Sequence, residues 1–193
     1  MGFLEDRKST AKSNYRNDEL KYAARNWHDI SRKFNYQYMF EMYGLPIIQD
    51  PQDIVMLQEL IWKSKPSIII ETGVARGGSL VLSASVLAVL DRCDENEVSK
   101  QNRRKVIGID IKITKESREA IESHPLNFMI DLIEGSSVDT ATLESLKQRI
   151  PNNSSVMVIL DSNHTHEHVR EELAAYSNLV TEGMPLIVMD TGI

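Results

Sequence analysis

A nine-residue segment with one acid and three glycines is the first part of the chain suited to chemistry. It runs Glu-Thr-Gly-Val-Ala-Arg-Gly-Gly-Ser from Glu71 to Ser79. Glycines lack a Cβ, so they allow tight turns and a close approach of a ligand to the backbone. The spacing, acid-x-Gly-x-x-x-Gly, differs from the Gly-x-Gly-x-x-Gly of dinucleotide sites. The segment indicates either a binding loop for a ligand with an amine or a turn that only packs a helix on a strand.

Polar side chains also follow the next two predicted strands. Asp110 ends the run Val-Ile-Gly-Ile, where a carboxylate can accept hydrogen bonds from both ribose hydroxyls or cap the next helix. Ser136 and Ser137 lie in a turn, where they can hydrogen-bond an adenine edge or cap a helix. With the acid-glycine loop, these residues suit S-adenosylmethionine, which carries an ammonium, a sulfonium and a carboxylate but no phosphate.

Carboxylates and histidines gather in the last part of the chain. Asp161 and Asp190 each end an apolar run, so adjacent parallel strands would bring them together. Two carboxylates suit a hard cation such as Mg²⁺. His164 is best placed to take a proton from an attacking hydroxyl. The alternatives are a zinc or iron site made by His164, His166 and His168, or histidines that are merely solvated at a helix start.

The elements that must position these residues are predicted from the apolar pattern. We expect strands over residues 67–71, 106–110, 128–134, 156–160 and 186–189. We expect helices between Asp50 and Lys65, over 80–90, 114–123 and 138–149, and after Thr165, where Val169, Leu173, Tyr176 and Val180 would face inward. This alternation predicts an α/β, Rossmann-like fold with a mostly parallel sheet and helices on both faces. Ligands bind such sheets at the carboxyl ends of the strands, where every candidate residue lies.

The amino-terminal part differs in composition. We predict that residues 1–42 form a helical or partly disordered lead-in and that residues 43–193 form the ligand-binding domain. The stretch from Trp27 to Tyr43 is rich in aromatic residues. It predicts either a helix that covers the core or part of a substrate lid. A charged linker is expected over residues 91–105.

Composition narrows the classes of protein. The formal net charge of -6 argues against nonspecific binding of nucleic acid, which needs a basic surface. Cys93 is the single cysteine, so neither a disulfide framework nor a thiolate-rich metal site can form within the chain. No apolar run is long enough for a signal peptide or a membrane span. We therefore expect a soluble, cytoplasmic protein.

The chain resembles the cephalosporin hydroxylase family from about residue 43 onward. The resemblance is carried by Tyr43-Gly44-Leu45-Pro46, Gln49, Pro51, Asp53, Gln58-Glu59, Ile61, Ile69 to Gly73, Arg76 to Ser79, Gly108 to Asp110, Gly135 to Ser137, and Leu160 to His166. It is specific because the Asp-Ser-Asn-His segment and the Arg-Gly-Gly-Ser loop occur together.

The resemblance implies a class I methyltransferase fold that uses S-adenosylmethionine, often with a metal. Family members look like O-methyltransferases that act on antibiotic intermediates or on sugars such as rhamnosyl groups. Position by position, it implies that the methionine part is held by Glu71, Gly73, Ala75, Arg76, Gly77, Gly78 and Ser79. It further places Asp110 at the ribose, Ser136 and Ser137 at the adenine, and Asp161 and Asp190 on Mg²⁺, with Asp161 also beside the cofactor.

Two departures from the family pattern bear on these expectations. Many members have an acid just before the aspartate matched to Asp190, whereas this chain has Met189. Metal binding is therefore expected to be weaker or to be completed by water. The chain stops at Ile193, soon after the fifth predicted strand, so the last two strands of a full class I sheet are expected to be missing. An uncovered sheet edge would favour a homo-oligomer.

We therefore predict an S-adenosylmethionine-dependent, metal-assisted O-methyltransferase that acts on a hydroxyl of a sugar, glycoside or natural-product intermediate. His164 is the expected base and Asp161 the metal-binding residue at the reacting hydroxyl. Two alternatives stay open, a metal-dependent hydroxylase and a non-catalytic cofactor-binding domain. A nicotinamide-dependent oxidoreductase would share the fold but would need the dinucleotide glycine spacing.

Overall fold

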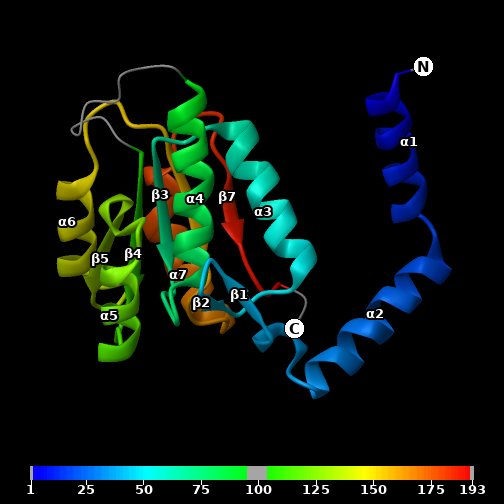
Figure 1. Ribbon diagram of the computed structural model, residues 1–193, viewed down its shortest axis with the longest axis horizontal. Coiled ribbons are helices and arrows are strands. Elements are labelled where there is room, and N and C mark those ends of the chain that lie inside the picture. Colours follow the sequence, from blue (N-terminus) through cyan, green and yellow to red (C-terminus); the bar gives the residue numbers. More distant parts are fainter. Residues whose placement is uncertain (1, 95–103, 192–193) are drawn as a thin grey trace. The chain divides into compact units, whose positions relative to one another are not determined.

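A five-stranded sheet forms the centre of the larger part of the chain (Figure 1). The computed structural model describes residues 2–94 and 104–191, and the chain divides into two compact units, Met1–Met39 and Phe40–Ile193. In the second unit the strands are ordered β5-β4-β3-β6-β7. Their bounds are Ile68–Thr72 for β3, Lys105–Asp110 for β4, Ile130–Glu134 for β5, Val156–Leu160 for β6 and Leu186–Val188 for β7. All neighbouring strands are parallel, as predicted.

The register of the central strands places the candidate residues at one edge of the sheet. Every residue of β3 and of β6 is buried, which explains their continuous apolar sequences. Thr72 is paired with Ile109 on one side and with Leu160 on the other. Asp110 and Asp161 therefore flank the loop that follows β3. Strand order also reverses at β3, which lies between β4 and β6, and such switch points are where α/β sheets bind ligands.

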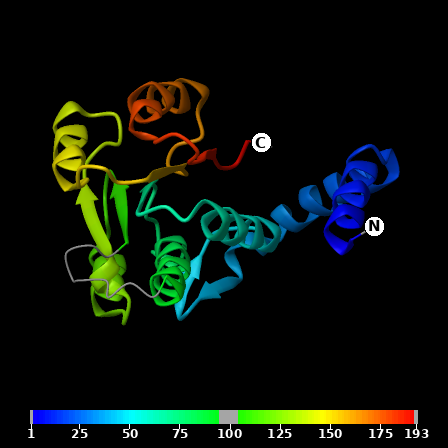
Figure 2. The same ribbon diagram turned by 90° about the horizontal axis from the view of Figure 1, so that it is seen from above.

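Helices cover both faces of the sheet, as predicted (Figure 2). One face carries α3 (Pro51–Ser64), α4 (Gly78–Cys93) and α5 (Lys115–Ser123), whose buried residues share a core with Ile69 and Met157. The other face carries α6 (Thr140–Arg149) and α7 (His166–Tyr176), which pack against Ile70 and Val158. Helix α4 continues beyond the expected end at Leu90 to Cys93, and residues 95–103 of the predicted charged linker lie outside the described residues.

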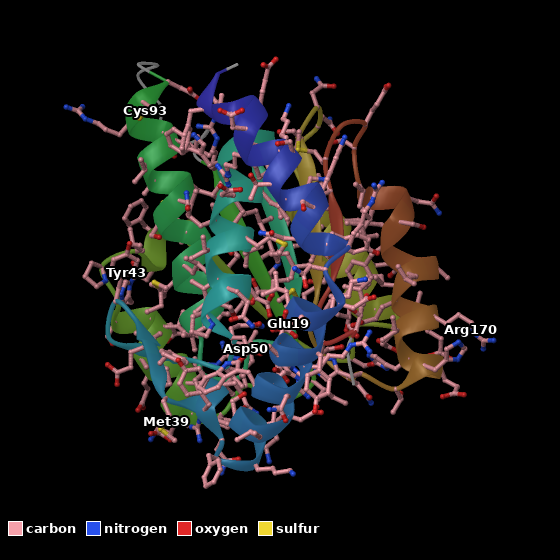
Figure 3. The ribbon with its side chains drawn as sticks, turned by 90° about the vertical axis from the view of Figure 1, so that its right-hand side faces the viewer. Glu19, Met39, Tyr43, Asp50, Cys93 and Arg170 are labelled. Atoms are coloured by element: carbon pink, nitrogen blue, oxygen red, sulfur yellow. The ribbon has the colours of Figure 1, made fainter. Side chains whose placement is uncertain are left out.

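A β-hairpin that the sequence did not predict precedes α3. Its strands are β1 (Phe40–Met42) and β2 (Leu45–Ile47). Tyr43 and Gly44 have positive φ angles of 48° and 91°, the combination that a type I′ turn requires. Tyr43 points outward from this turn (Figure 3), whereas Leu45 and Ile47 are buried in the core. The hairpin was missed because strands of three residues give almost no periodic signal.

The first unit consists of α1 (Phe3–Tyr15), α2 (Asp18–Lys33) and the 3₁₀ turn η1 (Tyr36–Tyr38). The side chain of Asn17 caps α2 by accepting from the backbone N–H of Leu20. The interpretation of residues 27–43 as one helix is wrong, since α2 ends at Lys33 and Asn35 is left-handed. Among the described residues, no helix is both long and apolar enough to cross a membrane.

The inward face of α7 is more polar than predicted. Tyr176 is fully buried as expected, but the other buried residue of the helix is Glu172, and Leu173 is 37% exposed. The apolar pattern misplaced the face by one position because buried polar side chains on α7 have partners of their own near the sheet edge.

Candidate active site

A cavity of about 370 Å³ opens at the carboxyl ends of β3, β4 and β6. The predicted residues that line it are Gly73, Ala75, Asp110, Ser136, Ser137 and Asp161. Three residues that the sequence did not assign to a cofactor, Ser162, Asn163 and His168, line it as well. A larger apolar groove of about 810 Å³ lies elsewhere, along α3 and α4, and none of the predicted site residues lines it. The cavity of about 370 Å³ is therefore the one that the candidate cofactor residues share, whereas His164 and Asp190 line a separate cavity of about 520 Å³.

Glu71 is a buried acid with an unsatisfied oxygen. It faces the same side of β3 as Ile69, beneath the start of α4, and only 1% of it is exposed. Ser79, in the first turn of α4, donates a hydrogen bond to its Oε1. Its Oε2 has no hydrogen-bond partner among the described residues. Burial raises the pKa of Glu71 to about 7, partly offset by the Ser79 hydrogen bond. A ligand ammonium would satisfy this oxygen and favour the ionised carboxylate.

The loop after β3 is held tightly by neighbouring segments. Gly73 has a φ of 91°, and a Cβ at this position would overlap the backbone carbonyl of Asp161. A Cβ on Gly77 would meet Leu45 and Ile121, and one on Gly78 would meet Pro46. The close approach at these two glycines is thus to the hairpin and to α5. Both still line a small cavity of about 40 Å³ between the loop and β2.

Arg76 extends away from the sheet edge toward α5. Its guanidinium contacts Glu116 at 3.1 Å, and both side chains are exposed. Its backbone remains in the loop that borders the small cavity. The side chain therefore ties the loop to α5 on the surface, where solvent and salt weaken such pairs.

Asp110 organises the glycine loop from the neighbouring strand. Its Oδ2 accepts from the backbone N–H groups of Val74 at 2.8 Å and Ala75 at 3.3 Å. Its Oδ1 accepts from the backbone N–H of Lys112 at 3.0 Å. A carboxylate has about four acceptor positions, so one remains for a ligand hydroxyl. Asp110 does not cap α5, because Thr114 does.

The serines after β5 likewise do not cap a helix. Asp139 caps α6 by accepting from Ala141. Ser136 and Ser137 line the cavity, and Ser137 is 6% exposed. The helix-cap interpretation of both serines is therefore wrong, and their place in the cavity wall agrees with the adenine interpretation.

Asp161, His164 and Asp190 form the one group of histidines, cysteines and acids within the described ranges whose geometry suits a metal ion. One potential ligand atom of each lies within 4.8 Å of the others, and Nε2 of His164 is 3.5 Å from Oδ2 of Asp190. The predicted meeting of the two aspartates across β6 and β7 is thus observed. Two carboxylates with water are a donor set that Mg²⁺ accepts.

The electrostatics of Asp161 favour a cation. Burial raises its pKa to about 8, and the negative charges of Glu71, Asp190 and Glu172 act in the same direction. Within the described ranges, the one opposing contact is a 2.7 Å hydrogen bond from the Nε2 of Gln49. Carboxylates that converge in this way repel one another, and a divalent ion at the cluster would remove that repulsion.

Gln49 is a site residue that motif reasoning missed. It lies between β2 and α3, and only 8% of it is exposed. The sequence offered it only as part of a family pattern. No periodicity marks a buried glutamine in a loop, so its contact with Asp161 is visible only in three dimensions.

The three-histidine metal site is wrong. The side chain of His166 is 84% exposed. Nε2 of His168 instead lies 3.2 Å from the hydroxyl oxygens of both Ser137 and Ser162, at the wall of the cavity of about 370 Å³. Only His164 reaches the aspartates, so these histidines do not converge on one ion.

The doubly wound parallel sheet, its acid-glycine loop and its strand-end acids define the Rossmann-like fold of class I methyltransferases. A family model described as Rhamnosyl O-methyltransferase/CmcI matches residues 34–193. The chain belongs to this family, which confirms the resemblance drawn from its motifs.

Individual relatives agree with this assignment. The rhamnosyl O-methyltransferase of Mycobacterium tuberculosis (strain ATCC 25618 / H37Rv) is 28% identical over 153 residues, which cover 78% of this chain and 56% of the relative. The enzyme of that name from Mycobacterium leprae (strain TN) is 27% identical over 152 residues, covering 78% and 59%. The chain therefore spans little more than half the length of these relatives.

Solved structures share the fold. An apo structure of CmcI has a TM-score of 0.53 and 23% identity, covering 78% of this chain and 57% of that chain. A CmcI structure described as Mg-SAM has a TM-score of 0.53 and 21% identity, covering 80% and 58%. A putative caffeoyl-CoA O-methyltransferase from Staphylococcus aureus has a TM-score of 0.56 and 15% identity, covering 96% and 73%.

Proposed function

We propose that this chain is an S-adenosylmethionine-dependent O-methyltransferase assisted by Mg²⁺. The observation that carries the proposal is the position of Asp161, which lines the ligand cavity and also belongs to the cluster of Asp161, His164 and Asp190. A cofactor cavity and a cation site thus share one wall. That arrangement suits transfer of a group from a bound cofactor to a hydroxyl held beside a metal.

The residues around the cavity fit the parts of S-adenosylmethionine. Glu71, with its unpaired buried oxygen, would bind the ammonium. Asp110 has an acceptor position left for a ribose hydroxyl. Ser136 and Ser137 would meet the adenine ring, because they follow β5 on the far side of Asp110.

His164 would act as the base. When bound, S-adenosylmethionine supplies the methyl group and Mg²⁺, held by Asp161 and Asp190, lowers the pKa of the acceptor hydroxyl. His164 lies beside Asp190 at 3.5 Å, so its imidazole can accept the hydroxyl proton there. The cavity wall would hold the acceptor oxygen and the methyl group in line, which supplies most of the acceleration in such transfers.

The acceptor that we propose is a small hydroxyl compound, either a sugar or glycoside or a natural-product intermediate. The support is the name of the mycobacterial relatives, rhamnosyl O-methyltransferase. Since the chain covers 56–59% of those proteins, the acceptor is inferred from their names and not from a pocket.

Isothermal titration with S-adenosylhomocysteine, with and without Mg²⁺, tests the proposal. We expect micromolar binding that Asp110→Ala abolishes. Asp131→Ala is the matched control, because Asp131 lies on the adjacent strand β5 and its carboxylate pairs with Lys105 at 3.0 Å. No binding by the folded chain, or equal binding by Asp110→Ala, would contradict the proposed cofactor site.

A further inference from the structure

A buried polar stripe on α7 lies beneath the cofactor cavity. His168, Glu172 and Tyr176 are spaced four residues apart, so they lie on one face of the helix. Glu172 is 1% exposed and Tyr176 is fully buried. The proposed methyl transfer assigns none of these three residues a role. A buried acid is costly unless it is well paired, so the contacts of the stripe matter.

The stripe contacts two of the three serines that line the cavity, Ser137 and Ser162. Nε2 of His168 lies 3.2 Å from the Oγ of Ser137 and 3.2 Å from the Oγ of Ser162. Ser162 donates a 2.7 Å hydrogen bond to Oε1 of Glu172, which is also 3.4 Å from Nε2 of His168. The hydroxyl of Tyr176 donates to the backbone carbonyl of Ser137 at 2.8 Å.

These partners assign the proton on His168. A carboxylate is only an acceptor, and the hydroxyl hydrogen of Ser162 is already directed to Glu172. An unprotonated Nε2 would therefore face two acceptor oxygens with its own lone pair. Hydrogen on Nε2 avoids this repulsion: the serine oxygens at 3.2 Å can then share it, and the Glu172 carboxylate lies 3.4 Å from Nε2.

The position of the hydrogen on His168 determines whether the hydroxyl of Ser137 donates or accepts in their contact. With hydrogen on Nε2, the Oγ of Ser137 accepts from His168, so its own hydrogen is not used in that contact. Within the described part of the chain, the other hydrogen bond of Ser137 is made by its backbone carbonyl, which accepts from Tyr176. Since Ser137 lines the cavity, its hydrogen is available to a ligand there. The carbonyl contact from Tyr176 fixes the backbone that carries it.

We propose that His168, held by Glu172, is a positioning residue that makes Ser137 a hydrogen-bond donor to one acceptor nitrogen of the adenine ring. The proposal rests on the proposed function, because it assumes S-adenosylmethionine in the cavity. It adds to that function the way in which the adenine of the cofactor is distinguished from other ring systems. A site that donates at one ring nitrogen rejects a base that lacks it, since the serine is then left unpaired.

The test compares S-adenosylhomocysteine with its 1-deaza, 3-deaza and 7-deaza forms, each of which replaces one ring nitrogen by C–H. Titration calorimetry of the wild-type chain should show one of the three binding about tenfold more weakly than the parent compound, the effect of one hydrogen bond. Ser137→Ala should bind the parent about tenfold more weakly and should bind all four compounds alike.

Variants of His168 separate positioning from general packing. His168→Ala should lose the discrimination, whereas His168→Gln, whose amide N–H₂ replaces Nε2–H, should regain much of it. His166→Ala is the matched control, since this neighbour on α7 has an 84% exposed side chain, and it should discriminate as the wild type does. A merely structural role would lower the affinity for all four compounds together.

The outcomes distinguish this proposal from the proposed function. If the wild type binds S-adenosylhomocysteine and all three deaza forms equally, the role of Ser137 and His168 is overturned while the cofactor site stands. Unchanged discrimination by His168→Ala also overturns it, and this readout needs only the wild type and a folded variant. If the wild-type chain binds none of the four, both proposals are wrong.

Discussion

The side-chain amide of Gln49 donates a 2.7 Å hydrogen bond to the carboxylate of Asp161, 112 positions further along the chain. This contact ties the segment after the β1–β2 hairpin to the end of β6. Among the residues that the structure describes, it is also the one interaction that stabilises ionised Asp161 against burial and the neighbouring carboxylates. The segment after the hairpin therefore acts on the proposed metal site without supplying a ligand of its own.

Gln49→Leu should weaken Mg²⁺ binding by about tenfold at neutral pH. The hydrogen bond that it removes stabilises the ionised carboxylate of Asp161, the form that binds a cation. Titration of the metal-free chain with Mg²⁺ measures the change. Gln52→Leu, at an exposed position on α3, is the matched control and should bind as the wild type does. Equal affinity of the two variants would show that Gln49 does not act on the metal site.

Gly73→Ala should lower the free energy of unfolding by at least about 3 kcal/mol. The residue has a positive φ, and the new methyl group would overlap the backbone carbonyl of Asp161. Gly183→Ala supplies the control, since Gly183 has a φ of 82° and no atom within 4 Å of the added Cβ. Only the backbone strain applies there, about 1 kcal/mol. Urea unfolding of the two variants measures the difference, and equal losses would mean that the loop and β6 can separate at little cost.

Much of this architecture could be predicted because long, buried elements leave a strong pattern in sequence. The continuous apolar runs of β3 and β6 predict a parallel sheet, and strand-end acids such as Asp110 and Asp161 then fall at one edge of it. The hairpin left no such pattern, since each of its strands has three residues. Burial of Glu172 was not predicted either, because its partner Ser162 comes from another element.

The ionisation of Glu71 should make the metal-free chain less stable as the pH rises. The folded state keeps the proton up to a pKa of about 7, whereas the unfolded chain releases it near 4.5. Between these values the folded state binds more protons, so the free energy of unfolding falls with increasing pH. For a fully buried acid the loss is on the order of 3 kcal/mol.

Glu71→Gln should remove the part of the decline that Glu71 contributes and leave the part due to Asp161, whose pKa is raised further, to about 8. Urea unfolding in the presence of a chelator, at about pH 5 and about pH 8, measures it. Glu134→Gln, at an exposed strand end where the carboxylate pairs with Arg118, is the control and should retain the wild-type dependence. Equal pH dependence of the wild type and Glu71→Gln would show that Glu71 is ionised in the folded state.

His164 adjoins Asp190 at 3.5 Å, so it can serve as a base or as a third metal ligand. As a base, it should affect turnover far more than metal affinity. His164→Ala should lower kcat by about 100-fold or more, the range of general base catalysis, with little change in Mg²⁺ binding. Added imidazole should restore part of the activity of His164→Ala and none of that of Asp161→Asn, which lacks a proposed metal ligand. If Mg²⁺ affinity falls in proportion to kcat and imidazole restores nothing, His164 binds the metal, and the proton must leave through another group.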